Sequence, residues 1–426
     1  MLAAIHYQMK TLKTDMTNQA EITDSEAVDL INALACALLF AAKARSADWG
    51  LFFQLIVLRD DPNSALKEIR ELHNLVQRIP ALEFFNHADQ YTLGHQKNVD
   101  FRFLVQWLIS RGQQIGAEGT IKDLIGYLSS ETIEVTEILA IDGFDVKENI
   151  KIGDYELIAW NNLVMTDTKY QVAVRGLFGG WDPTAALIQR HEIPRVHVRP
   201  WDHPIPYAPY SIEPALDVLR CITAIAGGGF RLRNYWLEPV EWAAWAVNFS
   251  TFGVDSTTIL HSVAINVVDV RSIRECVSHF SALDENRRLR LLVPLDRLNR
   301  SYLTGMRQVD KAIELGIAFE ALFSPIKLTE NITSTVCKRA EKFLGGTRNK
   351  RRKINNTFRD IYELRSRSVH SGRFDADGPD DWSDYQKVSS TLEEGQKLVG
   401  RSLVKVILEG EPDWDKFDIA GTDSSQ

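Results

Sequence analysis

The stretch ELRSRSVHSGRF, residues 363–374, follows an apolar repeat and carries Arg365 and, five positions later, His370. The apolar residues before it recur at steps of four and three: Ile354, Phe358 and Ile361. This spacing is typical of a helix with one buried face, and the next position of the series is Arg365. Gly372 indicates that the helix ends just after His370. The stretch is therefore either an ordinary polar helix end or part of a functional site.

The same kind of pattern predicts helices on both sides of this stretch. Pro325 ends the first of them, and Thr333 or Ser334 can cap the second, which stops at Gly345. The expected helices span residues 310–325, 334–344, 352–371 and 382–409. Together they predict a four-helix bundle over residues 301–410.

Glu320 is expected on the buried face of the first of these helices. The apolar stripe on that face consists of Ile313, Ile317, Ala321 and Leu322. A buried carboxylate without a partner is very costly, so we expect an ion pair between Glu320 and Arg365. Such a pair could by itself account for Arg365 as a purely structural residue, and this alternative stays open.

The charge of this region differs from that of the whole chain. The 426 residues carry a formal charge of −8, whereas residues 338–373 hold twelve basic and three acidic residues, a net of +9. The densest part is RNKRRK, residues 348–353, which we expect in a loop. A cationic patch on an acidic protein favours an anionic ligand, and a phosphate backbone is one candidate. A solvated charged loop is the alternative.

The C-terminal region resembles the Apea-like branch of the HEPN superfamily in four blocks that occur in the family's order. The blocks are Asp310, Glu320-Ala321-Leu322, Arg339, and Tyr362-Glu-Leu-Arg365-Ser366 followed by His370. The clear resemblance covers residues 300–410, about a quarter of the chain, and a fainter one covers residues 216–234. In the family a glycine often follows the histidine directly, whereas here Ser371 precedes Gly372.

This resemblance implies a bundle that dimerises and brings two copies of Arg365 and His370 together in one cleft. The implied activity is that of an endoribonuclease that needs no metal or other cofactor. The 2′-hydroxyl of the RNA attacks, histidine transfers protons, and arginine stabilises the phosphate. Ser366 and Tyr362 would orient this pair, with Glu320 as a further supporting residue.

The implied partners are RNA, with tRNA among the candidates, and a second copy of the chain. Members of this family act as toxin-like effectors in bacterial antiviral defence, and the resemblance extends that expectation to this protein. The side chains expected to dock the RNA backbone are Arg348, Lys350, Arg351, Arg352, Lys353, Arg367 and Arg373.

Two other functions remain open from the sequence. A non-catalytic RNA- or nucleotide-binding regulatory protein on the same scaffold would bind its ligand without cleaving it. A scaffold protein would use Arg365 and Glu320 only to hold the bundle together.

The whole chain predicts a mainly α fold with a β-rich middle region, in which an N-terminal α then β domain precedes the HEPN-like four-helix bundle. Helices are expected over residues 25–60, 64–79 and 99–140. Ser25 is a plausible cap for the first, and residues 111–119 form a turn-rich interruption of the last. From residue 141 onward, short β-branched and aromatic runs predict strands, and the prolines of residues 200–209 predict a linker.

We expect four consecutive parts. These are an α then β-rich recognition or regulatory region (1–210), a mixed connecting region (211–300), the bundle (301–410) and an acidic, frayed tail (411–426). The four cysteines lie far apart, so neither a zinc site nor a disulfide framework is expected. The scattered cysteines favour a reducing cytoplasm. No apolar run approaches the roughly 20 residues that span a bilayer, so no membrane partner is expected.

Overall fold

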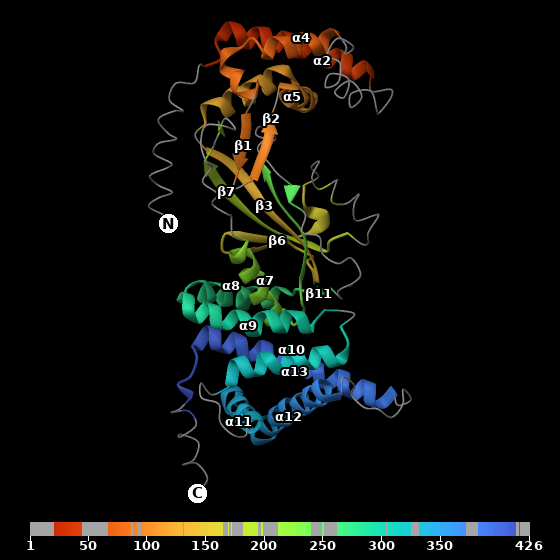
Figure 1. The fold of residues 1–426 in the computed structure, drawn as a ribbon, viewed down its shortest axis with the longest axis vertical. Coiled ribbons are helices and arrows are strands. Elements are labelled where there is room, and N and C mark those ends of the chain that lie inside the picture. Colours follow the sequence, from red (N-terminus) through yellow and green to blue (C-terminus); the bar gives the residue numbers. More distant parts are fainter. Residues whose placement is uncertain are drawn as a thin grey trace. The chain divides into compact units, whose positions relative to one another are not determined.

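The computed structural model describes most of the chain in segments. The described residues are 21–44, 67–86, 88–92, 95–99, 101–130, 132–164, 182–194, 197–198, 212–239, 249–250, 262–303, 306–324, 332–371 and 382–414, together with 169, 172 and 417. Within them helices predominate, and strands occupy the middle of the sequence (Figure 1). The predicted mainly α fold with a β-rich middle is therefore confirmed.

The chain divides into two compact units, and each is discontinuous in sequence. Unit 1 comprises residues 1–138, 190–211 and 236–250, and unit 2 comprises residues 139–189, 212–235 and 251–426. The division falls within three strands: β3 (Thr132–Asp142), β7 (Ala185–Pro194) and β9 (Arg231–Pro239). The sequence had suggested consecutive segments, because a strand shared by two units leaves no composition change at the point of division.

Unit 1 contains three long helices that bury one face each against the others. They are α2 (Asp24–Ala44), α4 (Lys67–Val76) and α5 (Phe101–Ser129). Their shared core includes Leu34, Leu72 and Leu108, all fully buried. The helices expected over residues 25–60 and 64–79 are present in these shorter forms, and residues 45–66 lie outside the described part.

The cap of α2 differs from the expected Ser25. The backbone N–H of Thr23 donates to the Glu26 carboxylate at 2.8 Å, and the N–H of Glu26 donates to the Thr23 hydroxyl at 3.3 Å. This reciprocal capping box satisfies backbone donors at the start of the helix, so the helix begins one residue earlier than Ser25.

Residues 99–140 are only partly helical, contrary to the expectation. The turn-rich segment 111–119 lies inside α5, and Gly116 alone leaves the helical conformation, with φ 81° and ψ 168°. Residues 132–140 are not helical but belong to β3. The run TIEVTEILAID is rich in β-branched side chains, which lose rotamer freedom in a helix and favour strands.

The described strands form three sheets. The strand orders are β2-β1-β8, β10-β9-β3-β7-β6-β5 and β11-β4. The bounds are β1 (Ala88–Thr92), β2 (His95–Val99), β4 (Phe144–Asp145), β5 (Ile150–Ile152), β6 (Tyr155–Ala159), β8 (His197–Val198), β10 (Phe249–Ser250) and β11 (Val263–Ala264). β6 pairs antiparallel with both β5 and β7, with Leu157 opposite Ile150 on one side and Leu187 on the other.

The strands expected from residue 141 onward are confirmed in part by β6. Most of residues 170–181 and the proline-rich residues 200–209 lie outside the described part. A short 3-10 helix, Trp160–Asn162, follows β6. Strands start earlier than the expected residue 141, because β1 and β2 already precede α5, and β3 begins at Thr132. The helices and strands of the N-terminal part therefore alternate along the sequence, whereas an α then β order was expected.

Unit 2 is dominated by helices. They are α7 (Glu213–Ala226), α8 (Val267–Ser281), α9 (Glu285–Ser301), α10 (Gln308–Phe323), α11 (Ile332–Leu344), α12 (Arg348–Ser371) and α13 (Trp382–Glu409). The last four match the helices predicted for residues 301–410, each within a few residues. α7 ends at Ala226, and Gly227 caps it with a left-handed φ of 76°.

The core of unit 2 is larger than a four-helix bundle. Buried side chains of α7, α8 and α9 join those of α10 to α13 in one continuous cluster, among them Cys221, Phe280 and Leu295. The region expected to be a mixed connection therefore supplies α8 and α9 to the same core. Phe358 of α12 lies at the centre of the α10–α12 contact, 3.9 Å from Phe319 and 5.8 Å from Phe323 between ring centroids.

The buried face of α10 is rotated from the predicted stripe. Its buried residues are Ala312, Leu315, Gly316, Ala318, Phe319, Leu322 and Phe323. Ile313 and Ile317 are only half-buried, and Ala321 is exposed. The two large phenylalanines set the orientation of the helix, because aromatic side chains contribute the most apolar area on burial.

The first residues of the expected tail belong to the core instead of fraying. The ring of Trp414 lies 5.7 Å from that of Phe323 and 5.9 Å from that of Phe343. The guanidinium of Arg339 stacks over the same indole at 5.2 Å. Aromatic stacking and the cation–π contact anchor this segment against α10 and α11.

Replacing Phe358 by alanine tests the α10–α12 packing. Phe358 is fully buried between two phenylalanines, and large-to-small changes in a core cost about 3–5 kcal/mol. We expect a loss of that size in the free energy of unfolding, measured with denaturant. The exposed Asn356→Ala on the same helix is the control and should change it by less than about 0.5 kcal/mol. Equal effects of the two variants would contradict the assigned core.

Candidate functional site

The expected ion pair between Arg365 and Glu320 is present. Nη1 of Arg365, on α12, donates to Oε1 of Glu320, on α10. The two side chains are 26% and 32% exposed, respectively. The pair therefore lies at the margin of the α10–α12 contact and not within the core, so water or a ligand can reach it.

A glycine provides the room for this crossing. The aliphatic part of the Arg365 side chain lies against Gly316, where a Cβ atom would collide with the Cδ of the arginine. A glycine inside a helix costs roughly 0.5–1 kcal/mol relative to alanine, and here it allows the guanidinium to pass over α10 to Glu320.

Tyr362 supports the pair from the buried side. Its ring centroid lies 5.8 Å from the guanidinium carbon of Arg365. Burial, and after it the negative charge of Glu320, raises the pKa of the Tyr362 hydroxyl above its ordinary value. Tyr362 therefore stays neutral and cannot act as a base. Within the described part its buried hydroxyl makes no hydrogen bond of ordinary geometry.

The pair leaves Arg365 able to bind a second anion. A guanidinium carries five N–H donors in one plane, and the bond to Glu320 uses a donor of Nη1. The remaining donors suit the oxygens of a phosphate, which arginine often binds with two parallel hydrogen bonds. Glu320 thus holds the guanidinium of Arg365 in position and leaves most of its N–H donors available for a second anion.

The other residues predicted near Arg365 are not in contact with the Arg365–Glu320 pair among the described contacts, or their side chains are not described. Ser366 is exposed, and among the described contacts it makes no hydrogen bond to Arg365 or Glu320. α12 stays helical through Ser371, so position 370 lies about 140° round the helix from position 365. The side chains of Arg367 and His370, and all of Arg373, lie outside the described part.

The segment RNKRRK forms the first turns of α12 and not the expected loop. Thr347 begins the helix, since its carbonyl accepts from Arg351 N–H at 2.9 Å and its hydroxyl from Lys350 N–H at 3.4 Å. The basic residues of these turns are all exposed: Arg348, Lys350, Arg351, Arg352 and Lys353. Ile354 and Phe358 bury the other face of the helix, which overrides the preference of a charged run for a loop.

These cations are largely unpaired in the described part of the chain. Lys353 lies 3.3 Å from Glu394, but its side chain is 70% exposed. Arg339, in contrast, does not join the surface patch, because it is buried and donates to the Phe323 carbonyl at 3.1 Å. Arg339 thereby satisfies the last turn of α10, a structural role at a helix C-terminus.

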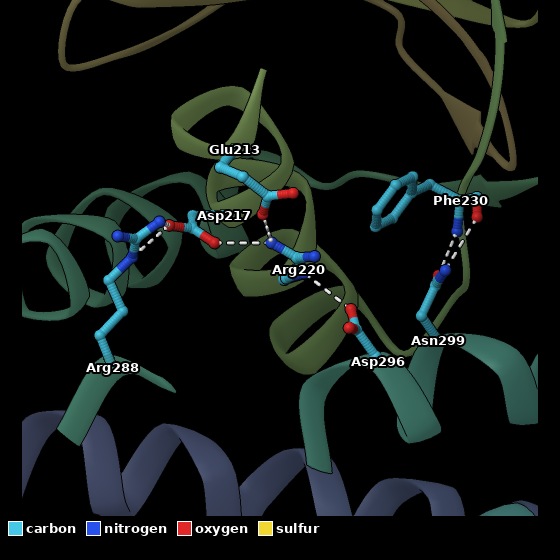
Figure 2. A network of polar contacts seen from close by, with 7 residues as sticks. All are labelled: Glu213, Asp217, Arg220, Phe230, Arg288, Asp296 and Asn299. Atoms are coloured by element: carbon cyan, nitrogen blue, oxygen red, sulfur yellow. Dashed lines mark hydrogen bonds and ion pairs between the residues drawn. The ribbon is translucent and has the colours of Figure 1, made fainter. Parts of the chain in front are cut away.

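A second polar cluster, drawn in Figure 2, joins α7 to α9. Arg220 donates to Asp217 at 2.7 Å, to Glu213 at 2.9 Å and to Asp296 at 2.7 Å. Arg288 donates to the other oxygen of Asp217 at 2.7 Å. Burial raises the pKa of Asp217, and the hydrogen bonds and charges of the two arginines oppose that shift.

The centre of this cluster is buried, which indicates a structural role, although the carboxylates of Glu213 and Asp296 at its edge are about half exposed. Both oxygens of Asp217 accept from arginines, and the side chains of Asp217 and Arg220 are each only 9% exposed. Nearby, Asn299 accepts from Phe230 N–H at 2.7 Å and donates to its carbonyl at 3.1 Å, which ties the chain before β9 to α9. Arg365 differs from this cluster because, among the described residues, it has a single carboxylate partner, and its side chain is 26% exposed.

Comparison of the chain with known protein families, curated proteins and solved structures gives no match. Among the described residues, no three histidine, cysteine or acidic side chains lie together as metal ligands would. The described helices are all too short or too polar to cross a bilayer. All four cysteines are free thiols.

Sequence reasoning missed the residues that shape the surroundings of Arg365. Gly316 carried a signal, because a glycine inside an amphipathic helix often marks a close approach. The sequence signal for the Arg220 cluster is weak, because charged residues spaced at i and i+3 are also common on exposed helix faces. Nothing in the local sequence shows that Asp296, far along the chain, completes it.

The cluster predicts a clear stability effect for Asp217→Ala. Removing this carboxylate takes a buried partner from both Arg220 and Arg288, while Glu213 and Asp296 still hold Arg220. Lost hydrogen bonds between charged groups cost about 1.5–3 kcal/mol. We expect that loss in a denaturant titration. Glu411→Ala, which breaks an exposed pair with Arg290, should cost less than about 1 kcal/mol. If both variants unfold at the same denaturant concentration, the cluster does not stabilise unit 2.

Proposed function

We propose that this protein is a metal-independent endoribonuclease of the HEPN type, in which Arg365 and His370 are the catalytic residues. The observation that carries the proposal is the placement of Arg365, anchored on one side by Glu320 and open on the other. The resemblance of residues 300–410 to the Apea-like branch supplies the link from this arrangement to RNA.

The chemistry follows from these two residue types. A histidine takes the proton from a ribose 2′-hydroxyl, whose oxygen attacks the adjacent phosphorus. The bond from phosphorus to the 5′ oxygen breaks, and a second histidine gives that oxygen a proton. Arg365 stabilises the extra negative charge on the phosphorus oxygens in the transition state. The products are a 2′,3′-cyclic phosphate end and a 5′-hydroxyl end.

Two imidazoles are needed at once, and a two-fold dimer of the chain supplies them. One copy of His370 then acts as the base while the other acts as the acid. The outer side of α10 offers an apolar surface for this contact, because Ile313 and Ile317 are half-buried and Ala321 is exposed beside Glu320. By resemblance, the nuclease is a toxin-like effector of bacterial antiviral defence.

The exposed cations of residues 348–353 dock the RNA backbone in this proposal. They stand on the same helix as Arg365, so a rigid element links the docking surface to the reacting phosphate. Phosphate contacts of this kind fix the register of a nucleic acid without reading its sequence.

A second candidate function is a non-catalytic RNA- or nucleotide-binding regulatory protein. The position of residue 370, about 140° round α12 from residue 365, favours it, since a single chain does not bring the two onto one helix face. Such a protein would keep the salt-dependent binding of the basic turns and release no cyclic phosphate ends.

His370→Ala tests the catalytic proposal. We expect the purified variant to lose at least about a hundredfold in RNA cleavage rate, as expected when a general acid–base group is removed, while its thermal unfolding stays unchanged. The matched control is His279→Ala, which removes an exposed histidine of α8 and should cleave like the wild type. Cleavage by His370→Ala at the wild-type rate would end the proposal; binding without any cleavage in the wild type would favour the second candidate.

Replacing Arg351 and Arg352 together by alanine tests the docking surface. Each lost phosphate contact should reduce the slope of log affinity against log salt by about 0.7 for single-stranded RNA. The double variant should therefore bind more weakly at low salt and show a flatter salt dependence in a fluorescence titration. Arg271→Ala, an exposed arginine of α8, is the control. An unchanged slope would place the RNA elsewhere.

A further inference from the structure

The side chain of Arg365 fits a notch on α10 that only a glycine leaves open. A Cβ atom at residue 316 would overlap the Cδ of Arg365 and lie 3.2 Å from its Nε. Packed atoms do not approach so closely, so a methyl group at Gly316 would force the arginine side chain to move. Glu320 stands four residues later on the same face of α10 and accepts the bond from Nη1 at the far end of the notch.

A second glycine notch receives the preceding turn of α12. At Gly395, on α13, a Cβ atom would overlap the Cδ1 of Ile361 and lie 3.4 Å from the Cδ1 of Leu315. Ile361 and Arg365 are four residues apart, so they project from successive turns of one helix face. Gly395 thus receives a fully buried apolar side chain, whereas Gly316 receives a cation that is 26% exposed.

The contacts around the guanidinium of Arg365 leave one of its edges for a ligand. Nη1 donates to Glu320, and the guanidinium carbon lies 5.8 Å from the centroid of the Tyr362 ring. Among the described contacts, Nε and Nη2 make no hydrogen bond. These two nitrogens form an edge with two parallel N–H donors, which matches two oxygens of a phosphate. The direction of that edge follows from where the notch places Cδ and Nε.

Arg365 needs this second constraint beside Glu320. A partly exposed ion pair holds a long side chain weakly, because ordering its rotamers costs entropy. At the notch, Cγ and Cδ of Arg365 lie close against α10, which fixes the stem of the side chain. The notch and the carboxylate together hold both ends of the side chain while the Nε–Nη2 edge keeps its donors.

We propose that Gly316 is a positioning residue of the nuclease: the open notch holds Arg365 so that its Nε–Nη2 edge meets two oxygens of the scissile phosphate. The inference rests on the proposed nuclease function and adds a residue that contacts neither the RNA nor the reacting atoms. It also accounts for a glycine on a buried helix face that otherwise consists of Ala, Leu and Phe, although glycine disfavours the helix more than any residue except proline.

Gly316→Ala in the full-length protein tests this role. The added methyl group displaces the stem of Arg365, and a displacement of about 1 Å can cost about a hundredfold in rate. We expect kcat for cleavage of a labelled RNA to fall by at least about tenfold. KM should change little, because the cations of residues 348–353 still dock the RNA. Gly126→Ala adds a methyl group to a helical glycine with open space around it and should cleave like the wild type.

Gly395→Ala distinguishes displacement of Arg365 from a general loosening of α12. Its methyl group would overlap Ile361 in the core, so this variant should unfold at a lower temperature than the wild type. We expect its kcat to change little at a temperature where both proteins are folded. An equal loss of kcat in Gly395→Ala and Gly316→Ala would overturn the proposal, as would a wild-type kcat in Gly316→Ala.

Thermal unfolding in two backgrounds tests the contact without RNA. Alanine favours a helix over glycine, so Gly316→Ala should raise Tm by about 1–4 °C in an Arg365→Ala background. With Arg365 present, the overlap should cancel or reverse this gain, and the difference measures the coupling of the two residues. Equal shifts of Tm in both backgrounds would overturn the positioning role. Coupling in a wild type that cleaves no RNA would instead overturn the nuclease function, and with it the role of the notch in catalysis, while confirming the contact itself.

Discussion

The side chain of Arg365 crosses from α12 to α10 over Gly316 and ends on Glu320, and the candidate site depends on this crossing. The stacked rings of Phe319 and Phe358 bring the two helices together beside it. Because the ion pair sits at the margin of that contact, its desolvation cost is smaller than for a fully buried pair. The cation is therefore held in a defined position and still faces solvent, which a purely structural pair would not require.

The Arg220 cluster of α7 and α9 shows what a structural arrangement looks like in the same unit. Asp217 and Arg220 are nearly excluded from water, and each carboxylate oxygen of Asp217 has an arginine donor. Arg220 already donates to Glu213, Asp217 and Asp296, and its side chain is only 9% exposed, so a ligand anion has little access to it. At Arg365 a phosphate can add to the free donors without displacing Glu320. This difference in remaining donor capacity, more than the presence of charge, separates the two clusters.

Periodicity placed the helices of residues 301–410 within a few residues, because each buries a regular apolar face and ends at glycine or proline. It also anticipated the Arg365–Glu320 pair, since burial of two opposite charges demands partners. Periodicity gave the wrong result where contacts between residues far apart in the sequence determine which face of a helix is buried. The face of α10 is set by Phe319 and Phe323 packing on Phe358, and no local pattern ranks these above Ile313 and Ile317. The anchoring of Trp414 on Phe323 and Phe343 likewise depends on helices that lie far away in sequence.

The basic run at the start of α12 has an energetic cost that its surroundings must offset. Cations in the first turn of a helix oppose the macrodipole, by roughly 0.3–1 kcal/mol each at low salt, and like charges crowd one another. The Thr347 cap and the burial of Ile354, Phe358 and Ile361 offset that cost. Neither needs the cations, and replacing them by neutral residues would make the helix more stable. An anion bound across these turns would offset both the unfavourable interaction of the cations with the helix macrodipole and their mutual repulsion. A ligand that carries phosphates would therefore stabilise this helix.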